Sequence, residues 1–164
     1  MSDTSTYSIL FVCTGNTCRS PMAEAMLRAK LPPEARGRIR VASAGVAAAP
    51  GMPASANTVK VLERAGITPG EHRSRPLAAA MLEATDLVLA LTAEHRRAIL
   101  GILPSAAEKT YVLSDFAAPP GREDELVVHD PVGGSLEIYE ETFRRIRLHL
   151  ERALPEILGR VGAG

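Results

Sequence analysis

The chain has 164 residues, of which 46% are hydrophobic and 23% charged, and its 19 basic side chains balance 19 acidic ones. That length suits a single domain, residues 1–164, whose core needs neither disulfide bonds nor a structural metal. The zero formal net charge argues against non-specific electrostatic binding to nucleic acid or to an anionic membrane surface. An aromatic content of 4% leaves few rings on which bases could stack.

The cysteine content and the N-terminus indicate the compartment. The two cysteines, Cys13 and Cys18, cannot form a disulfide framework, and the four histidines show no zinc-ligand spacing. The N-terminal stretch lacks the basic start and long apolar run of a signal peptide. No apolar stretch approaches the length that spans a bilayer. We therefore expect a cytoplasmic protein without membrane or nucleic-acid partners, and we expect it to be a monomer.

The first predicted elements are a strand and a helix. The apolar run Ile9–Val12 ends before Gly15, as a buried strand would. A helix then starts with Ser20 as the N-cap and Pro21 at the first helical position. The helix carries apolar residues four positions apart on the face that packs on the core. Strand, loop and helix together are the opening of a βαβ unit.

The same alternation continues along the chain. Further strands are predicted at 38–44, 86–91 and 111–113, and further helices at 54–65, near 76–81, after Thr92 to 100, and at 136–154. Gly66 and Gly101 are expected to end two of these helices. The Pro-, Gly- and acid-rich stretch 114–134 is expected to be a functional loop. The pattern predicts an α/β fold, a doubly wound, mostly parallel sheet with ligand sites at the carboxyl ends of its strands.

Residues 13–20 read Cys-Thr-Gly-Asn-Thr-Cys-Arg-Ser and lie between the first strand and the first helix. Such a loop aims backbone N–H groups inward, and the helix dipole adds positive potential, so the segment predicts an oxyanion site. Arg19 adds a planar guanidinium that can hold two phosphate oxygens. Gly15 and Asn16 tolerate the positive φ that we expect in this loop. Because no Lys-Ser/Thr pair follows a glycine, it is not a nucleotide P-loop.

Cys13 is expected at the base of this loop, where the field that binds phosphate also stabilises a thiolate. A thiolate beneath a bound phosphate is aligned for in-line attack on phosphorus. Ser20 is expected to donate its hydroxyl to that sulfur. Taken singly, Cys13 is more simply a buried apolar thiol and Arg19 a solvated arginine. The joint pattern of cysteine, arginine, Gly-Asn and Ser-Pro favours catalysis.

The acid-rich loop 114–134 is where we expect a side chain that acts as a general acid. Its five acidic residues are Asp115, Glu123, Asp124, Glu125 and Asp130. Only Asp130 precedes a proline, which restricts it to an extended conformation, and Gly133-Gly134 follows to let a substrate approach. Most acids on loops are solvated charges, so the residues alone leave Asp130 as one candidate among several.

The segment Val12–Ala25 resembles the active-site signature of the low-molecular-weight cysteine phosphatases, and the resemblance covers the whole chain. Ser43-Ala44-Gly45, His72–Arg75 and Asp130-Pro131 fall where that family has similar motifs. The resemblance implies a four-stranded parallel sheet flanked by helices, with the phosphate-binding loop after its first strand. It also implies catalysis without metal or other cofactor, acting on phosphorylated proteins.

The same resemblance assigns roles to individual residues. It implies a phosphocysteine intermediate on Cys13, phosphoryl oxygens bound by Arg19, and Asp130 as the acid that protonates the leaving group and then activates water. The loop residues expected to bind substrate are Thr14, Gly15, Asn16, Thr17, Cys18 and Ser20. Ser43 and His72, with Asn16 and Ser20, would hold the loop through hydrogen bonds. Cys18 is either a small apolar filler or a redox partner that closes on Cys13 after peroxide forms a sulfenate.

Two positions of the sequence indicate the substrate class: Thr17 and the residue after the Asp-Pro pair. Phosphotyrosine members of the family typically carry a larger aliphatic residue where this chain has Thr17, and an aromatic residue after the Asp-Pro pair. The combination of residues 13–20 with the Asp-Pro segment resembles the bacterial protein arginine phosphatases. Their substrate presents a cationic, polar guanidinium, which suits a threonine hydroxyl and a carboxylate in the site. Val132 departs from their pattern, because they have an aromatic residue there. Alternatives, in order, are a tyrosine phosphatase, an arsenate reductase that uses an external thiol, and a phosphate-binding module.

Overall fold

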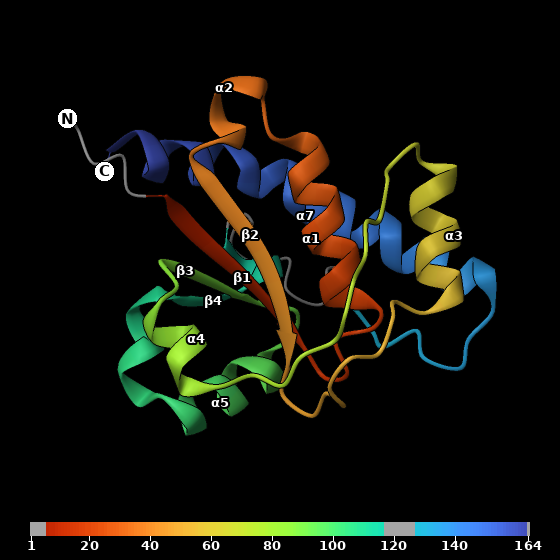
Figure 1. The fold of residues 1–164 in the computed structure, drawn as a ribbon, viewed down its shortest axis with the longest axis horizontal. Coiled ribbons are helices and arrows are strands. Elements are labelled where there is room, and N and C mark those ends of the chain that lie inside the picture. The colour runs from red at the N-terminus through yellow and green to blue at the C-terminus, as the bar shows by residue number, and fades with distance from the viewer. Residues whose placement is uncertain (1–5, 117–126, 164) are drawn as a thin grey trace.

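Four parallel strands form the centre of the computed structural model, which describes residues 6–116 and 127–163 (Figure 1). The strands are β1 (Tyr7–Cys13), β2 (Ile39–Gly45), β3 (Leu87–Ala90) and β4 (Thr110–Val112). Their order in the sheet is β2-β1-β3-β4, and each neighbouring pair is parallel. The predicted doubly wound, four-stranded parallel sheet is therefore confirmed.

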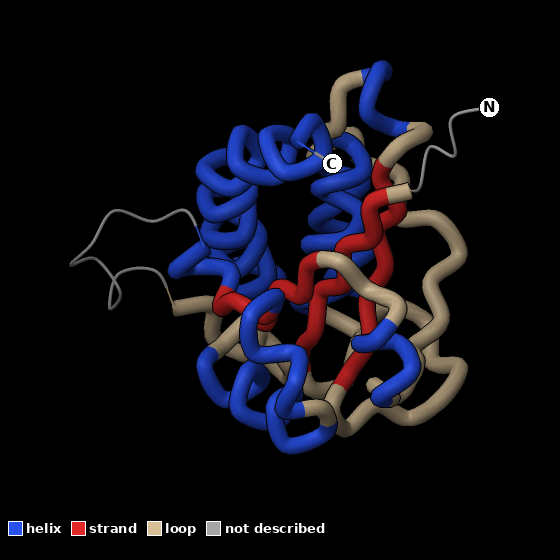
Figure 2. The backbone as a smooth tube through the Cα atoms, turned by 90° about the vertical axis from the view of Figure 1, so that its left-hand side faces the viewer, coloured by secondary structure: helices blue, strands red, loops and turns tan. Residues whose placement is uncertain are grey.

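Helices cover both faces of this sheet (Figure 2). They are α1 (Arg19–Lys30), α2 (Pro33–Arg36), α3 (Ala56–Arg64), α4 (Ala79–Glu83), α5 (Ala93–Ile102), α6 (Leu113–Phe116), α7 (Leu136–Ala163) and the 3-10 helix η1 (Pro104–Lys109). One apolar cluster joins the sheet to α1, α3 and α7, and a second joins it to α4, α5 and η1.

The residues of β1 alternate between these two clusters. Ile9 and Phe11 pack with α1 and α7, whereas Leu10 and Val12 pack on the opposite face with α4 and α5. All four are at most 2% exposed. A strand buried on both faces has no position for a polar side chain, which explains its continuous apolar run.

The order of the strands determines where a ligand site can form. The chain passes from β1 to β2 on one side and then returns past β1 to β3 on the other. The carboxyl ends of β1 and β3 are therefore neighbours at the point where the winding direction reverses, and crevices form at such points. Cys13 is the last residue of β1 and pairs with Gly45, the last residue of β2.

Several predicted helix boundaries were wrong. α1 begins at Arg19 with Cys18 in the N-cap position, so Ser20 lies inside the first turn and is not the cap. The hydroxyl of Ser20 contacts Cys13 instead of a helix N–H group. The helix expected near Pro76 begins only at Ala79, because Pro76 forms an isolated bridge beside β2.

Other differences concern where helices stop and which were missed. α5 continues through Gly101 to Ile102, both of which are exposed. α7 continues past Leu154 to Ala163 with Pro155 inside it, because the packing of Ile157 and Val161 on the core outweighs local propensity. β4 ends at Val112, and Leu113 already belongs to α6. The short helices α2, η1 and α6 were not predicted. Thr92 caps α5 by accepting a hydrogen bond from the backbone N–H of His95.

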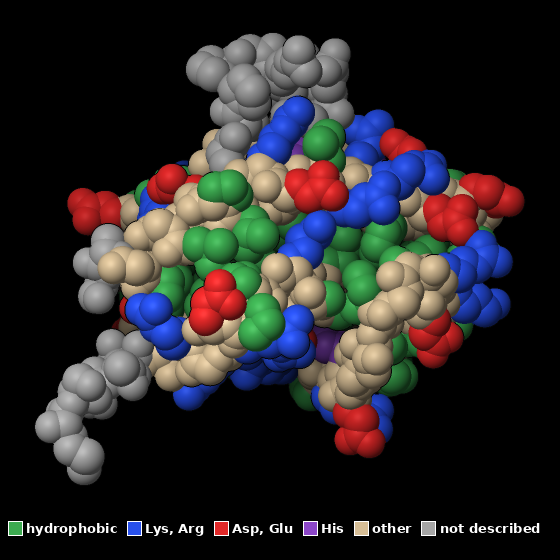
Figure 3. Space-filling model, turned by 90° about the horizontal axis from the view of Figure 1, so that it is seen from above, with side chains coloured by type: hydrophobic (Ala, Val, Ile, Leu, Met, Phe, Trp, Pro, Cys, Tyr) green, Lys and Arg blue, Asp and Glu red, His purple; other side chains and the backbone are tan. Residues whose placement is uncertain are grey.

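Charged side chains on the surface are interspersed by sign. Figure 3 shows one face of the molecule, on which basic and acidic side chains lie side by side around apolar patches. Several of them form ion pairs within or between helices, such as Arg28 with Glu24 and Arg64 with Glu140. Within the two described ranges, no helix is long and apolar enough to cross a membrane.

Candidate active site

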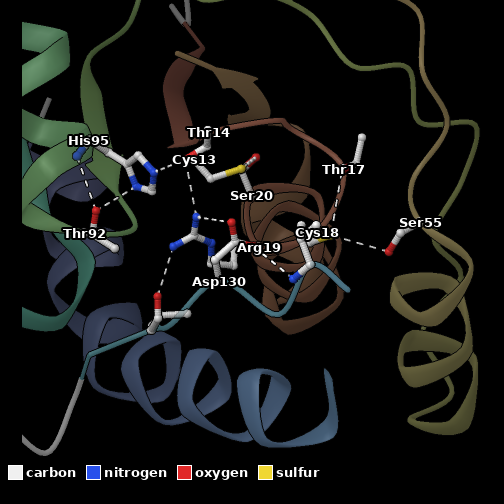
Figure 4. A network of polar contacts seen from close by, with 12 residues as sticks. Cys13, Thr14, Thr17, Cys18, Arg19, Ser20, Ser55, Thr92, His95 and Asp130 are labelled. Carbon is white, nitrogen blue, oxygen red and sulfur yellow. Dashed lines mark hydrogen bonds and ion pairs between the residues drawn. The ribbon is translucent and has the colours of Figure 1, made fainter. Parts of the chain in front are cut away.

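Cys13 lies at the floor of the loop that joins β1 to α1. Its side chain is 2% exposed, and its Sγ is 2.9 Å from the Oγ of Ser20 in the first turn of α1 (Figure 4). The Ser20 oxygen already accepts a hydrogen bond from Asn16 Nδ2 at 2.8 Å. The hydroxyl hydrogen of Ser20 is therefore free to be donated to the sulfur, and such a donor stabilises a thiolate.

Asn16 holds the loop in its curved shape. It is fully buried and adopts a φ of +58°, the left-handed region that Asn tolerates better than most residues. Its amide donates to Ser20 and, at 2.9 Å, to Ser43 Oγ in β2, and its Oδ1 accepts from the backbone N–H of Arg75 at 3.0 Å. The backbone oxygen of Asn16 accepts from His72 Nε2 at 2.6 Å. The structure thus brings Ser20, Ser43 and His72 together around Asn16.

Gly45 allows β2 to approach this loop closely. A Cβ at this position would collide with the carbonyl oxygen of Thr14 and would lie 3.0 Å from the backbone N of Asn16. By contrast, Gly15 is not in the positive-φ region that we expected for it, and a Cβ there would meet only Thr17 Oγ1 at 3.8 Å. Within the described residues, the loop thus takes its left-handed turn at Asn16, and glycine is sterically required at 45.

Arg19 is buried beside the loop, and among the described residues its guanidinium has three contacts. Its Nη1 donates to the carbonyl oxygen of Val128 at 3.1 Å, and its Nη2 donates to Thr14 Oγ1 at 3.5 Å. Nη2 also lies 3.7 Å from Asp130 Oδ2, whose side chain is 49% exposed. Asp130 Oδ1 in turn accepts from the backbone N–H of Val132 at 3.1 Å. Arg19 and Asp130, separated by more than a hundred positions in the chain, therefore face one another (Figure 4).

Thr17 and Cys18 lie on the other side of the loop. The carbonyl oxygen of Thr17 accepts from the backbone N–H of Ser55 at 2.9 Å, which ties the loop to the N-cap of α3. Cys18 Sγ lies 3.5 Å from Ser55 Oγ and 3.3 Å from the hydroxyl of Tyr139 in α7, and burial raises the pKa of Tyr139. Both cysteines are free thiols. Cys18 is therefore in contact with hydroxyl groups and is not surrounded only by apolar atoms.

His95 belongs to the site but does not follow from the sequence reasoning. The ring is 4% exposed and lies between two hydroxyls, Thr14 Oγ1 at 2.8 Å from Nε2 and Thr92 Oγ1 at 3.0 Å from Nδ1. Burial, with a further contribution from the positive charge of Arg19, lowers the pKa of His95 to about 4. Its place in the sequence could have indicated this role, because His95 lies one turn after the carboxyl end of β3, and ligand sites form at the carboxyl ends of such strands.

A cavity of about 580 Å³ opens beside Arg19 and His95. Thr14, Val128 and Asp130 also line it, and so does Asp115 of α6, which the sequence offered as an alternative acid. The further alternatives Glu123, Asp124 and Glu125 lie outside the described residues. Among the described acidic residues of this loop, Asp130 is the one that faces Arg19. The arrangement combines a buried thiol with a hydroxyl donor, a guanidinium and a solvent-accessible carboxylate, which together suit nucleophilic attack on an oxyanion.

Comparison with known proteins gives one family. Residues 8–163 match the family described as low molecular weight phosphotyrosine protein phosphatase. A protein-arginine-phosphatase of Geobacillus stearothermophilus is 40% identical over 146 residues, which is 89% of this chain and 93% of that protein. The low molecular weight protein-tyrosine-phosphatase Etp of Escherichia coli is 34% identical over 149 residues, 91% of this chain and 90% of that protein.

Solved structures agree with this relationship. The YwlE arginine phosphatase from Geobacillus stearothermophilus superimposes with a TM-score of 0.82 at 37% identity, covering 94% of both chains. A cysteine-to-serine mutant of the YwlE arginine phosphatase, with a phosphorylated active-site serine, gives a TM-score of 0.80 at 35% identity, covering 94% of this chain and 99% of that one. In that protein, the residue in place of the cysteine carries the phosphoryl group.

The close approach at Gly45 makes one substitution informative. In Gly45→Ala the new methyl group would collide with the Thr14 carbonyl, so we expect a loss of about 1–3 kcal/mol in the free energy of unfolding. We also expect weaker binding of inorganic phosphate, because the loop must shift. Urea unfolding and calorimetric titration with phosphate measure the two effects. Gly37→Ala is the control, since nothing lies within 4 Å of a Cβ there; equal stability of the two variants would contradict the argument.

The lowered pKa of His95 predicts how stability depends on pH. Unfolded His95 takes up a proton near its ordinary pKa, whereas folded His95 does so only near a pKa of about 4. The free energy of unfolding should therefore fall as the pH is lowered from about 6.5 towards 4. Urea unfolding of the parent and of His95→Gln across this interval isolates the contribution, and we expect a weaker pH dependence in the variant. Identical pH dependence in both proteins would refute the assignment.

Proposed function

The chain belongs to the low molecular weight phosphotyrosine protein phosphatase family, and we propose that it is a cysteine-dependent protein phosphatase that hydrolyses phosphoarginine. The observation that carries the mechanism is the contact of 2.9 Å between Cys13 Sγ and Ser20 Oγ at the floor of the loop. A hydroxyl donor at that distance favours the sulfur as an anion, which is the nucleophilic form.

In the first step of the proposed reaction, the Cys13 thiolate attacks phosphorus and the P–N bond of phosphoarginine breaks. The guanidinium of Arg19 and the inward-facing N–H groups of the loop stabilise the charge on the equatorial oxygens. Asp130 donates its proton to the departing guanidino nitrogen. The products are a phosphocysteine on Cys13 and the unmodified arginine of the protein substrate.

In the second step, Asp130, now a carboxylate, takes a proton from water. The oxygen of that water attacks phosphorus, the S–P bond breaks, and inorganic phosphate leaves. Ser20 assists both steps, since its hydroxyl stabilises the sulfur as nucleophile and again as leaving group. The half-exposed side chain of Asp130 suits this exchange of protons with water. Every bonding change uses side chains of this chain and one water molecule.

The remaining loop residues have supporting roles in this proposal. Asn16, Ser43 and His72 hold the backbone of residues 14–18 so that its N–H groups face the phosphoryl oxygens. Thr14, Gly15, Thr17 and Cys18 contribute backbone to the same surface. The contacts of Asn16 with β2 and with segment 72–75 support this assignment, because they fix the loop before any substrate binds.

The choice of phosphoarginine depends on the rim of the site. Thr17 offers a hydroxyl that can accept a hydrogen bond from a guanidinium, and Val132 offers no aromatic ring on which tyrosine could stack. The relative at 40% identity is named a protein-arginine-phosphatase, which supports the same choice. Phosphotyrosine is the second candidate, because Val132 also departs from the arginine phosphatases. Arsenate reduction ranks below it, since no cysteine follows Cys18 to relay electrons.

The partners in this proposal are phosphorylated proteins. A phosphoryl group on an arginine side chain must reach a thiol that is 2% exposed, so the substrate segment has to present that side chain outward. We place the activity in the cytoplasm and in a monomer. The balanced charge supports a partner that is neither nucleic acid nor an anionic membrane.

Replacement of the nucleophile tests the mechanism. We expect Cys13→Ser to lower kcat by a factor of about 1,000 or more, because a neutral hydroxyl is a much weaker nucleophile than a thiolate and a serine alkoxide is a much poorer leaving group in the second step. The free energy of unfolding and the affinity for inorganic phosphate should change little, since the side chain keeps its size and place. Steady-state kinetics with a phosphoarginine peptide, alongside urea unfolding, gives both readouts. Turnover close to that of the parent would eliminate Cys13 as the nucleophile.

Selectivity is tested at Thr17. We expect the parent to have the higher kcat/KM for a phosphoarginine peptide than for a phosphotyrosine peptide of matched sequence. Thr17→Ile should move the ratio towards phosphotyrosine by about tenfold or more, because the variant replaces a hydroxyl by apolar surface. Thr17→Ser keeps the hydroxyl and is the matched control. A parent that prefers phosphotyrosine would overturn the substrate assignment while leaving the cysteine mechanism in place.

A further inference from the structure

His95 lies outside the phosphate-binding loop, on the first turn of α5, yet its ring touches the loop. Both ring nitrogens are paired with hydroxyls, Nε2 with Thr14 Oγ1 at 2.8 Å and Nδ1 with Thr92 Oγ1 at 3.0 Å (Figure 4). The side chain is 4% exposed. A buried ring held at two points has a fixed position and a fixed orientation.

Thr92 accounts for this fixed orientation. It is the N-cap of α5, and its Oγ1 accepts from the backbone N–H of His95 at 3.3 Å while it also contacts the ring. One hydroxyl thus holds both the backbone and the imidazole of His95. Because α5 starts directly after β3, and β3 lies beside β1, the ring is aimed across the carboxyl ends of these strands at Thr14.

Thr14 connects the ring to the guanidinium of Arg19. Its hydroxyl oxygen accepts from Arg19 Nη2 at 3.5 Å, and the same nitrogen lies 3.7 Å from Asp130. The other terminal nitrogen of Arg19 donates to the Val128 carbonyl oxygen. Thr14 directly follows the nucleophile Cys13 in the chain. Its contact with Arg19 therefore links the orientation of the guanidinium to the phosphate-binding loop.

We propose that His95 is a positioning residue, which fixes the Thr14 hydroxyl and, through it, sets the orientation of the Arg19 guanidinium towards a bound phosphoryl group. The inference rests on the proposed phosphatase function and extends it to a residue outside the loop. His95 has no part in proton transfer to the substrate, since both of its nitrogens are already engaged. Its contribution is geometric, and a displaced guanidinium stabilises the transition state less well.

The charges around His95 agree with a neutral ring. The positive charge of Arg19, which lies beyond Thr14, lowers the pKa of His95, and the negative charge of Asp130 raises it by a smaller amount. Glu94, Arg97 and Asp115 line the same cavity. Burial and Arg19 keep the pKa of His95 near 4, so at neutral pH the ring adds no second cation beside the guanidinium. A charged ring at this place would repel Arg19 and withdraw the acceptor capacity of one nitrogen.

Two substitutions separate the contacts of the ring. The amide of glutamine reaches about as far as Nε2 and that of asparagine about as far as Nδ1, so His95→Gln retains the bond to Thr14 while His95→Asn loses it. We expect His95→Gln to keep kcat/KM for an aryl phosphate within about threefold of the parent, and His95→Asn to lose about tenfold or more, mainly in kcat. The affinity for inorganic phosphate, measured by calorimetry, should weaken in His95→Asn only.

A double-mutant cycle tests whether His95 acts through Thr14. Thr14→Val removes the hydroxyl at nearly constant volume, and adding His95→Asn to it should cause little further loss, because the shared contact is already gone. Full additivity of the two losses would overturn the proposal. Equal impairment of His95→Gln and His95→Asn, at equal free energies of unfolding, would also overturn it. The pH dependence of kcat/KM between about 5 and 8 should be the same in the parent and His95→Gln.

Titrations with inorganic phosphate distinguish a failure of the positioning role of His95 from a failure of the proposed phosphatase function. If the parent binds phosphate but hydrolyses neither phosphoarginine nor the aryl phosphate, the phosphatase assignment fails. The contrast between His95→Gln and His95→Asn in phosphate affinity still decides whether His95 orients Arg19. If the parent is active and both variants bind phosphate as it does, the positioning role fails and the phosphatase assignment remains.

Discussion

The buried amide of Asn16 is the interaction on which the rest of the site depends. A left-handed φ costs most non-glycine residues about 1–2 kcal/mol and asparagine less, so contacts in the loop are still needed to hold Asn16 in this conformation. Asn16 obtains them from Ser20, Ser43 and the backbone of Arg75, each within 3.0 Å. The amide also occupies an acceptor site of Ser20 and thereby directs the Ser20 hydroxyl hydrogen to Cys13. The same side chain thus shapes the loop and prepares the sulfur.

The fold and the loop 13–20 could be predicted from the sequence because their signals are local, whereas the choice of Asp130 and the roles of Ser43 and His72 depended on the family resemblance. An apolar run such as Ile9–Val12, followed by Gly-Asn and Ser-Pro, places a loop at the carboxyl end of a strand whatever the rest of the chain does. The helix start at Ser20 was wrong because tertiary contacts claim that hydroxyl. His95 and Tyr139 were missed because their importance arises from packing across the sheet and from α7. No spacing along the chain encodes those contacts.

The charge of Arg19 is only partly neutralised, and this matters for anion binding. Among the described residues, its partners are two neutral oxygens, of Val128 and Thr14, and one carboxylate at 3.7 Å that is half exposed to water. Ion pairs of that kind are weak, because solvent screens them. The guanidinium is thus held in place mainly by neutral acceptors and keeps its attraction for a phosphoryl group. A tight buried pair with a carboxylate would have fixed the arginine equally well while cancelling its charge.

The two parts of the site differ in burial, and the difference bears on the choice of substrate. The loop floor, with Cys13, Asn16 and Arg19, is buried, whereas Asp130 and Val132 are exposed, the latter by 66%. A phosphoryl group presents the same oxygens on arginine as on tyrosine, so the buried floor has nothing by which to tell them apart. Discrimination must then come from the rim, from Thr17 and from the segment after Asp130. Because Val132 is largely exposed, substitutions in the segment after Asp130 can change the substrate class without disturbing the contacts of Asn16 that maintain the floor.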